Sequence, residues 1–95
     1  NDMSREMAAS VLNKKIAILQ SRLKNKNVVI KLSNKAHEFL INEGFSERYG
    51  AREMDRAIRH HLNTLLMKEI LFGQLKDGGK VFVELVNNSL ALKYK

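Results

Sequence analysis

The feature that most constrains the fold is a glycine-bounded loop followed by a long run of residues at helical spacing. After the segment from Gly44 to Gly50, side chains suited to a protein interior recur every three or four positions, at Met54, Ile58, His61, Leu62 and Leu65. At about 100° per residue these positions lie on one side of a helix. The pattern predicts a helix from Ala51 to Phe72 that stops at Gly73 and buries one edge.

The other edge of this predicted helix is basic. Within about 60° of one another at helical spacing lie Arg52, Arg56, Arg59 and Asn63. Arg52 stands where the loop meets the helix, and its guanidinium stays charged at any accessible pH and can bind two phosphate oxygens at once. It is either a phosphate-binding cation or a structural arginine that bridges the loop to Glu43 or Glu47, and spacing alone leaves both open.

The remaining chain has the pattern of an α+β fold in the order helix, strand, helix, helix, strand, strand. The three helices and the three strands of a small sheet are expected at residues 4–25, 28–32, 33–44, 51–72, 80–86 and 90–94. Asp77-Gly78-Gly79 marks a turn, and Asn87-Asn88 suits a two-residue hairpin turn because asparagine tolerates positive φ.

Local signals place the ends of the middle elements. Ser33 is expected to cap the second helix with its hydroxyl, and Gly44 to end it in a left-handed conformation. Phe45 and Tyr49 are expected to pack inward and anchor the loop. Glu53 suits a first helical turn, where a carboxylate meets the positive end of the helix dipole.

Composition indicates one compact domain over residues 1–95, expected to be a piece of a longer chain. With 95 residues and 44% hydrophobic content the sequence can bury a single core. No apolar run approaches the roughly 20 residues of a membrane span, so no membrane partner is expected. The absence of cysteine fits a reducing compartment, and the cytoplasm is the expected location.

The net charge of +7 raises a second hypothesis, a small basic nucleic-acid-binding domain. Its contact surface would be the face of Arg52, Arg56 and Arg59. Nucleic acid is the less favoured partner, because no aromatic residues interleave with these arginines as single-strand stacking would need. A membrane-surface helix over residues 4–24 is weaker still, since core packing explains its apolar face.

The sequence carries no signature of catalysis or of a metal site. It has no cysteine and no Gly-X-X-X-X-Gly-Lys-Ser/Thr loop, so it lacks the phosphate cradle and the magnesium ligand that ATP hydrolysis needs. His60 and His61 are adjacent on a helix and diverge by about 100°, which prevents chelation of one ion from one face. No catalytic residue and no metal ligand is predicted.

The chain nevertheless resembles a known domain. The resemblance is carried by Gly44-Phe45, Tyr49-Gly50-Ala51-Arg52, Ala57-Ile58, Glu69-Ile70-Leu71-Phe72-Gly73-Gln74-Leu75 and Asp77-Gly78-Gly79. Together these segments resemble the C-terminal small, or lid, domain of the second AAA+ module in Clp/Hsp100 protein unfoldases. The Leu-Phe-Gly before the last hairpin is more typical of the ClpA branch, the ATP-binding subunit of the Clp protease, than of ClpB or ClpC.

This resemblance implies a function in a larger ATP-driven machine. Arg52 would be the sensor 2 arginine, positioned by Gly50 and Ala51 and directed at the γ-phosphate of ATP. The nucleotide, ATP or ADP with magnesium, would be held mainly by the large AAA+ subdomain of the same chain. Further implied partners are the neighbouring subunits of a hexamer and a ClpP-type peptidase.

Arg56 and Arg59 are candidates for the subunit interface, the alternatives being a solvated face or a stripe that tracks phosphates. Two positions depart from the family pattern. Glu53 stands where proline usually follows the arginine, and Ser46 stands where aspartate often follows the aromatic residue. Both proline and glutamate suit the start of a helix.

Overall fold

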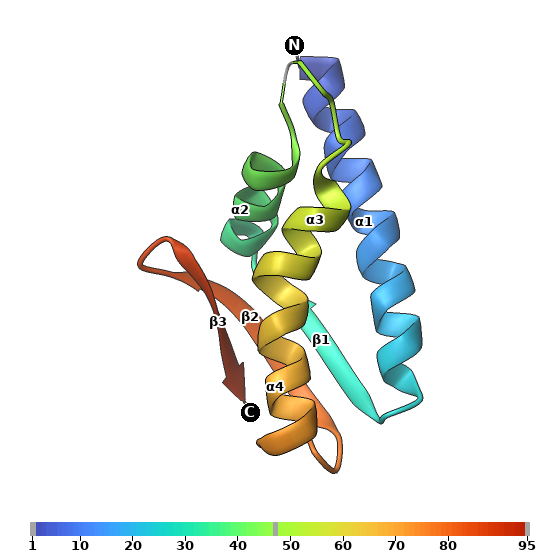
Figure 1. Ribbon diagram of the computed structural model, residues 1–95, viewed down its shortest axis with the longest axis vertical. Coiled ribbons are helices and arrows are strands. Elements are labelled where there is room, and N and C mark those ends of the chain that lie inside the picture. The colour runs from blue at the N-terminus through green and yellow to red at the C-terminus, as the bar shows by residue number, and fades with distance from the viewer. Residues whose placement is uncertain (1, 47, 95) are drawn as a thin grey trace.

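The protein is an α+β domain in which helices pack on a small three-stranded sheet (Figure 1). The computed structural model describes residues 2–46 and 48–94. Its elements are α1 (Asp2–Lys24), β1 (Val28–Leu32), α2 (Asn34–Gly44), α3 (Met54–Ala57), η1 (Ile58–Asn63), α4 (Thr64–Phe72), β2 (Gly79–Val86) and β3 (Ser89–Tyr94). The predicted fold class and element order are confirmed, with α3, η1 and α4 forming one continuous helical rod.

The sheet has the order β1-β2-β3 and is mixed. β1 runs parallel to β2, with Val28 opposite Gly79, because α2 and the rod carry the chain back between them. β2 and β3 form an antiparallel hairpin whose turn residues Asn87 and Asn88 have φ of 52° and 63°. Positive φ at both central residues is the requirement of the favoured two-residue turn, so this prediction is confirmed.

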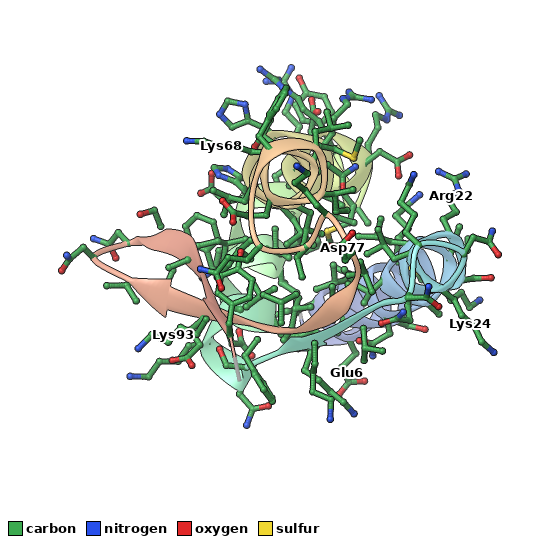
Figure 2. The ribbon with its side chains drawn as sticks, turned by 90° about the horizontal axis from the view of Figure 1, so that it is seen from below. Glu6, Arg22, Lys24, Lys68, Asp77 and Lys93 are labelled. Atoms are coloured by element: carbon green, nitrogen blue, oxygen red, sulfur yellow. The ribbon has the colours of Figure 1, made fainter. Side chains whose placement is uncertain are left out.

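The core lies between the inner face of the sheet and the helices. Figure 2 shows the rod end-on above the sheet, with α1 beside it and the labelled charged side chains on the outside. Alternate residues of β2 point inward and are fully buried. The buried apolar residues are Ala8, Leu12, Leu23, Val28, Ile30, Ala36, Leu40, Ile41, Met54, Ala57, Ile58, Leu62, Leu66, Ile70, Leu75, Val81, Val83 and Leu90.

The ends of α2 follow the prediction at one terminus and not at the other. The Ser33 hydroxyl accepts a hydrogen bond from the Ala36 N–H at 3.1 Å, as expected for an N-cap. The prediction of a left-handed Gly44 is wrong, because Gly44 is the last residue of α2 and does not have positive φ. A Cβ there would lie 2.8 Å from Met54 Cα, so glycine is required by the close approach of the two helices.

The start of the rod also differs from the prediction. Helical structure begins at Met54 rather than Ala51, and the Glu53 side chain makes no capping hydrogen bond. Phe45 packs against the core as expected, but Tyr49 is 48% exposed and does not anchor the loop inward. Residues 51–53 form a turn, so Arg52 precedes the helix and does not lie on its face.

A π-helical turn, η1, interrupts the rod and explains how it keeps one buried edge. The buried residues of the rod that are spaced by four are Met54, Ile58, Leu62, Leu66 and Ile70. In an α-helix each step of four residues drifts by about 40°, and four steps would drift by about 160°. A π turn is wider, with i→i+5 hydrogen bonding, and its extra residue offsets part of that drift.

Replacing Gly44 by alanine is expected to destabilise the domain by about 1–3 kcal/mol, because the new methyl group would overlap the Met54 backbone. Helix propensity alone predicts the opposite sign, a gain of about 0.5–1 kcal/mol. The free energies of unfolding of the wild type and of Gly44→Ala, measured in urea, show which of the two signs holds. Gly50→Ala is the comparison for backbone strain without overlap, since a Cβ there meets no atom within 4 Å but the φ of 63° is unfavourable for alanine. A neutral or stabilising Gly44→Ala would contradict the packing account.

Candidate functional site

The loop between α2 and α3 is closed by its own backbone. The Ser46 N–H donates to the Gly50 carbonyl at 3.0 Å, and the Gly50 N–H donates to the Ser46 carbonyl at 2.7 Å. Gly50 has φ of 63°, a conformation that glycine adopts without strain. The Ser46 hydroxyl accepts from the Tyr49 N–H at 3.0 Å. Serine therefore supplies the short acceptor that an aspartate could supply at this position.

Arg52 projects from this closed loop and is exposed. Its guanidinium lies 5.7 Å from the centre of the Tyr49 ring, and the Arg48 guanidinium lies 5.2 Å from the same centre. Among residues 2–46 and 48–94, no carboxylate forms an ion pair with Arg52. In the described part of the chain this cation contacts an aromatic face, which leaves the guanidinium available for an anion.

Of the two carboxylates proposed to bridge Arg52, one lies in the described residues and does not bridge it. Glu43 contacts the His61 Nε2 at 3.0 Å instead, and Glu47 lies outside the described residues. The neighbouring Glu53 lies 3.9 Å from Arg56, on the helix side of the loop. Glu43 and Glu53, which stand on either side of the loop, therefore pair with residues other than Arg52.

The structure places Arg56 and Arg59 on different sides of the rod, and Arg52 precedes the rod. Arg56 lines a hollow beside Glu43 and His61, between α2 and the rod. Arg59 lines a different hollow, between the rod and α1. The basic stripe expected from a straight helix is thus divided, and the nucleic-acid hypothesis gains no continuous contact surface from these three residues.

The two adjacent histidines belong to a packing arrangement. The ring of His61 meets the Phe39 ring edge-on with centroids 4.9 Å apart, and the His60 ring lies 4.8 Å from that of His61. Across the part of the chain that the structure describes, no group of three or more potential ligands could hold a metal ion.

Sequence reasoning missed a polar clamp at the far end of the rod. The Glu69 carboxylate accepts hydrogen bonds from the Tyr94 hydroxyl at 2.7 Å and from the Gln74 N–H at 3.2 Å. The Glu69 carbonyl accepts from the N–H groups of Gly73 and Leu75, each at 3.0 Å. A Cβ on Gly73 would lie 3.1 Å from Glu69 Cα. The spacing of Glu69 and Gly73 could be read from the sequence, but Tyr94, the partner of Glu69, lies far along the chain.

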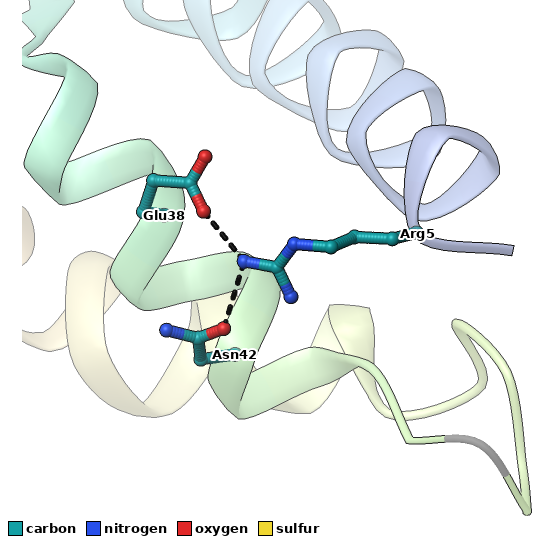
Figure 3. A network of polar contacts seen from close by, with 3 residues as sticks. All are labelled: Arg5, Glu38 and Asn42. Carbon is teal, nitrogen blue, oxygen red and sulfur yellow. Dashed lines mark hydrogen bonds and ion pairs between the residues drawn. The ribbon is translucent and has the colours of Figure 1, made fainter. Parts of the chain in front are cut away.

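The opposite end of the domain is pinned by Arg5, which reaches from α1 to α2 (Figure 3). Its guanidinium lies 2.5 Å from a Glu38 carboxylate oxygen and 2.9 Å from the Asn42 side-chain oxygen. The start of α1, the end of α2 and the arginine loop lie at the same end of the molecule (Figure 1). These contacts hold α1 and α2 together beside the loop.

Comparison with known proteins identifies the family. The sequence pattern of the C-terminal, D2-small domain of ClpB protein matches residues 3–83. The chain belongs to the ClpB D2-small family. The match ends within β2, so β3 and the Tyr94 contact lie beyond it.

Relatives of this D2-small domain include both ClpB and ClpA proteins. The chaperone protein ClpB of Bacillus anthracis is 33% identical over 85 residues, which cover 90% of this chain and 10% of the relative. The ClpB of Gloeobacter violaceus is 33% identical over 86 residues, covering 90% and 10%. The ClpA homolog protein of Fuscovulum blasticum is 33% identical over 91 residues, covering 96% and 12%.

The chain therefore spans about a tenth of the length of the curated relatives it matches. The matches do not separate a ClpA branch from ClpB, so the finer assignment suggested by Leu71-Phe72-Gly73 is not confirmed. In the described residues of this D2-small domain, no helix has the length and apolar content to cross a membrane.

The clamp at Glu69 makes the stability of the domain depend on pH at both extremes. The hydrogen bond from Tyr94, then that from Gln74, lowers the pKa of Glu69 below its ordinary value. Burial, then the contact with Glu69, raises the pKa of Tyr94 to about 12. The Glu69 contribution is therefore present above the unfolded pKa and is lost as pH falls through the folded one.

For Tyr94 the sign is opposite, because its folded pKa lies above the value of 10.0 for an unperturbed tyrosine. Its contribution is complete below pH 10 and is lost as pH rises toward 12. Tyr94→Phe is expected to lower the unfolding temperature at neutral pH. In this variant the unfolding temperature should also fall less between pH 10 and pH 12 than it does in the wild type. Thermal unfolding across pH measures this, with Tyr49→Phe as control. Equal pH profiles for Tyr94→Phe and the wild type would contradict the clamp.

Proposed function

We propose that this domain is the lid of an ATP-dependent protein unfoldase and that Arg52 is its sensor 2 arginine. The observation that carries the proposal is an exposed guanidinium at the end of a closed loop, with no carboxylate partner among the described residues, in a chain of the ClpB D2-small family. ATP or ADP with magnesium would be held mainly by the large AAA+ subdomain of the same protein, and Arg52 would bind the γ-phosphate.

The energetics favour release of Arg52 to a phosphate. An exposed cation–π contact such as that with Tyr49 is worth about 0.5–1 kcal/mol. A hydrogen bond between charged groups is worth about 1.5–3 kcal/mol. Bound only in the ATP state, such a contact can shift an open–closed equilibrium by about 10- to 150-fold. The aromatic ring therefore holds the arginine weakly enough for a phosphate to take it.

The backbone supports the positioning role of the residues before Arg52. The reciprocal hydrogen bonds of Ser46 and Gly50 fix the start of the turn, and the Ala51 carbonyl accepts from the Met54 N–H at 3.1 Å. Arg52 is thus set between a closed loop and the first residue of a helix. This domain would then pass nucleotide state on by moving as a rigid body.

In a hexamer the lid would also contact a neighbouring subunit, for which Arg56 and Arg59 are candidates. Both are exposed, and they line different sides of the rod. The ClpA assignment, a ClpP-type peptidase partner and a cytoplasmic location stay predictions from the sequence. The isolated domain is not itself proposed to hydrolyse ATP.

Arg52→Ala in the full-length protein is expected to lower ATP-dependent substrate unfolding by tenfold or more, since the loss of about 1.4 kcal/mol is a factor of ten. The thermal stability of the variant should match the wild type, because Arg52 is exposed. Unfolding of a fluorescent substrate measures the activity. Arg48→Ala is the matched control, since it removes an arginine from the same aromatic ring. Wild-type unfolding and ATPase rates in Arg52→Ala would remove Arg52 from the mechanism.

A further inference from the structure

A second surface of the domain is built like a binding groove. Two adjoining hollows of about 450 and 200 Å³ lie between the second half of α1 and the rod, and they share Leu19, Arg22 and Asn63. Their remaining lining residues are Lys15, Ile18, Leu23, Lys26, Asp55, Ile58, Arg59, Leu66 and Met67. This groove starts at Asp55 in the first turn of the rod and extends along the rod away from the arginine loop, which lies beside the start of α1 (Figure 1).

Both walls of the groove are regular stripes of one helix face. On α1 the stripe follows helical spacing through Lys15, Leu19 and Arg22. On the rod, the groove residues Asp55, Arg59, Asn63 and Met67 stand four positions apart. The π turn lies inside that stripe and offsets the drift that would otherwise rotate Met67 away from Arg59. The underwound segment thus gives the groove a continuous second wall.

The floor of the groove holds an unpaired hydrogen-bond acceptor. The side-chain oxygen of Asn63 is shielded from solvent, and no donor among the described residues reaches it. Buried polar atoms are generally paired, so this orphan acceptor lowers the stability of the folded domain. Beside it, Ile18 and Met67 remain 55% and 44% exposed, although both are large apolar side chains.

The rim of the groove is cationic. Its described lining contains four cations, Lys15, Arg22, Lys26 and Arg59, and one carboxylate. That carboxylate, Asp55, is already paired with Lys15 at 2.7 Å. Figure 2 shows Arg22 leaving α1 on the side where the rod lies, opposite to Lys24. Three cations therefore face the groove without a described carboxylate partner.

We propose that this groove docks a short acidic segment of a partner protein. Carboxylates of the segment pair with Arg22 and Lys26, and an aliphatic side chain covers Ile18 and Met67. The small volume of the two hollows suits the side chains of one segment, and the charge selects an acidic one. The proposal is independent of the role of Arg52.

The test uses the full-length protein that carries this domain and a phage-displayed library of random short peptides. Peptides selected on the wild-type protein are expected to combine aspartate or glutamate with an aliphatic residue. Arg22→Glu with Lys26→Glu should weaken the selected peptides by more than about tenfold. Lys14→Glu with Lys35→Glu makes the same charge change on exposed residues outside the groove and should leave binding unchanged.

Failure of the library to yield acidic peptides, or equal loss of binding in the two charge-reversed proteins, would overturn the proposal. So would competition by single-stranded DNA as effective as that by the selected peptide, since it would mark a general polyanion surface.

A substitution at the orphan acceptor tests its effect on the stability of the domain. Asn63→Leu is expected to raise the unfolding temperature, because it removes a buried unpaired oxygen. Thermal unfolding of the wild type and of Asn63→Leu measures this. A lower unfolding temperature in Asn63→Leu would contradict the unpaired state of the oxygen.

Discussion

The rest of the structure depends on the way the long helical rod keeps one edge buried. Its buried residues recur every fourth position, a spacing that an α-helix cannot keep on one side over its whole length. The π turn at Ile58–Asn63 resolves the conflict by widening the helix in the middle. The same adjustment sets the outer faces, because residues four apart on the exposed side also stay aligned. Packing of the core and the geometry of the groove therefore share one cause.

The place of Arg52 follows from a second constraint, the close approach of α2 and the rod. Gly44 and Met54 are almost in contact, so the chain between them must leave the helix pair and return within a short distance. It does so through a loop closed on Ser46 and Gly50. Arg52 follows this loop directly and is exposed. The close approach at Gly44 therefore limits where the loop can leave and return, and the loop in turn sets the place of Arg52.

Much of the fold could be predicted because its signals are local. The strand at Val28–Leu32, the Ser33 cap and the Asn87-Asn88 turn each rest on residue types within a few positions of one another. What could not be predicted depends on contacts between distant segments. Gly44 is glycine because of Met54, and Glu69 is held by Tyr94, 25 positions away. Spacing gave no sign of either.

The site shows the same division between local and distant information. Arg52 could be singled out from the loop-to-helix pattern and from the resemblance, but its setting on the Tyr49 ring could not. The stripe of Arg52, Arg56 and Arg59 assumed one regular helix from Ala51. The late start at Met54 breaks that assumption at one end. The π turn changes the helical period further on.

The role of the dispersed positive charge depends on where each cation lies in the structure and what it contacts. Arg5 binds two residues of α2 and serves the fold, and Lys15 is neutralised by Asp55. Arg52 lies exposed beside the Tyr49 ring at one end of the molecule, and Arg22 lines a groove between α1 and the rod. The cations behind the net charge of +7 are therefore of two kinds, those paired within the domain and those at separate places without a described carboxylate partner. Long-range attraction follows from the sum, whereas recognition depends on which cations lack a partner within the domain.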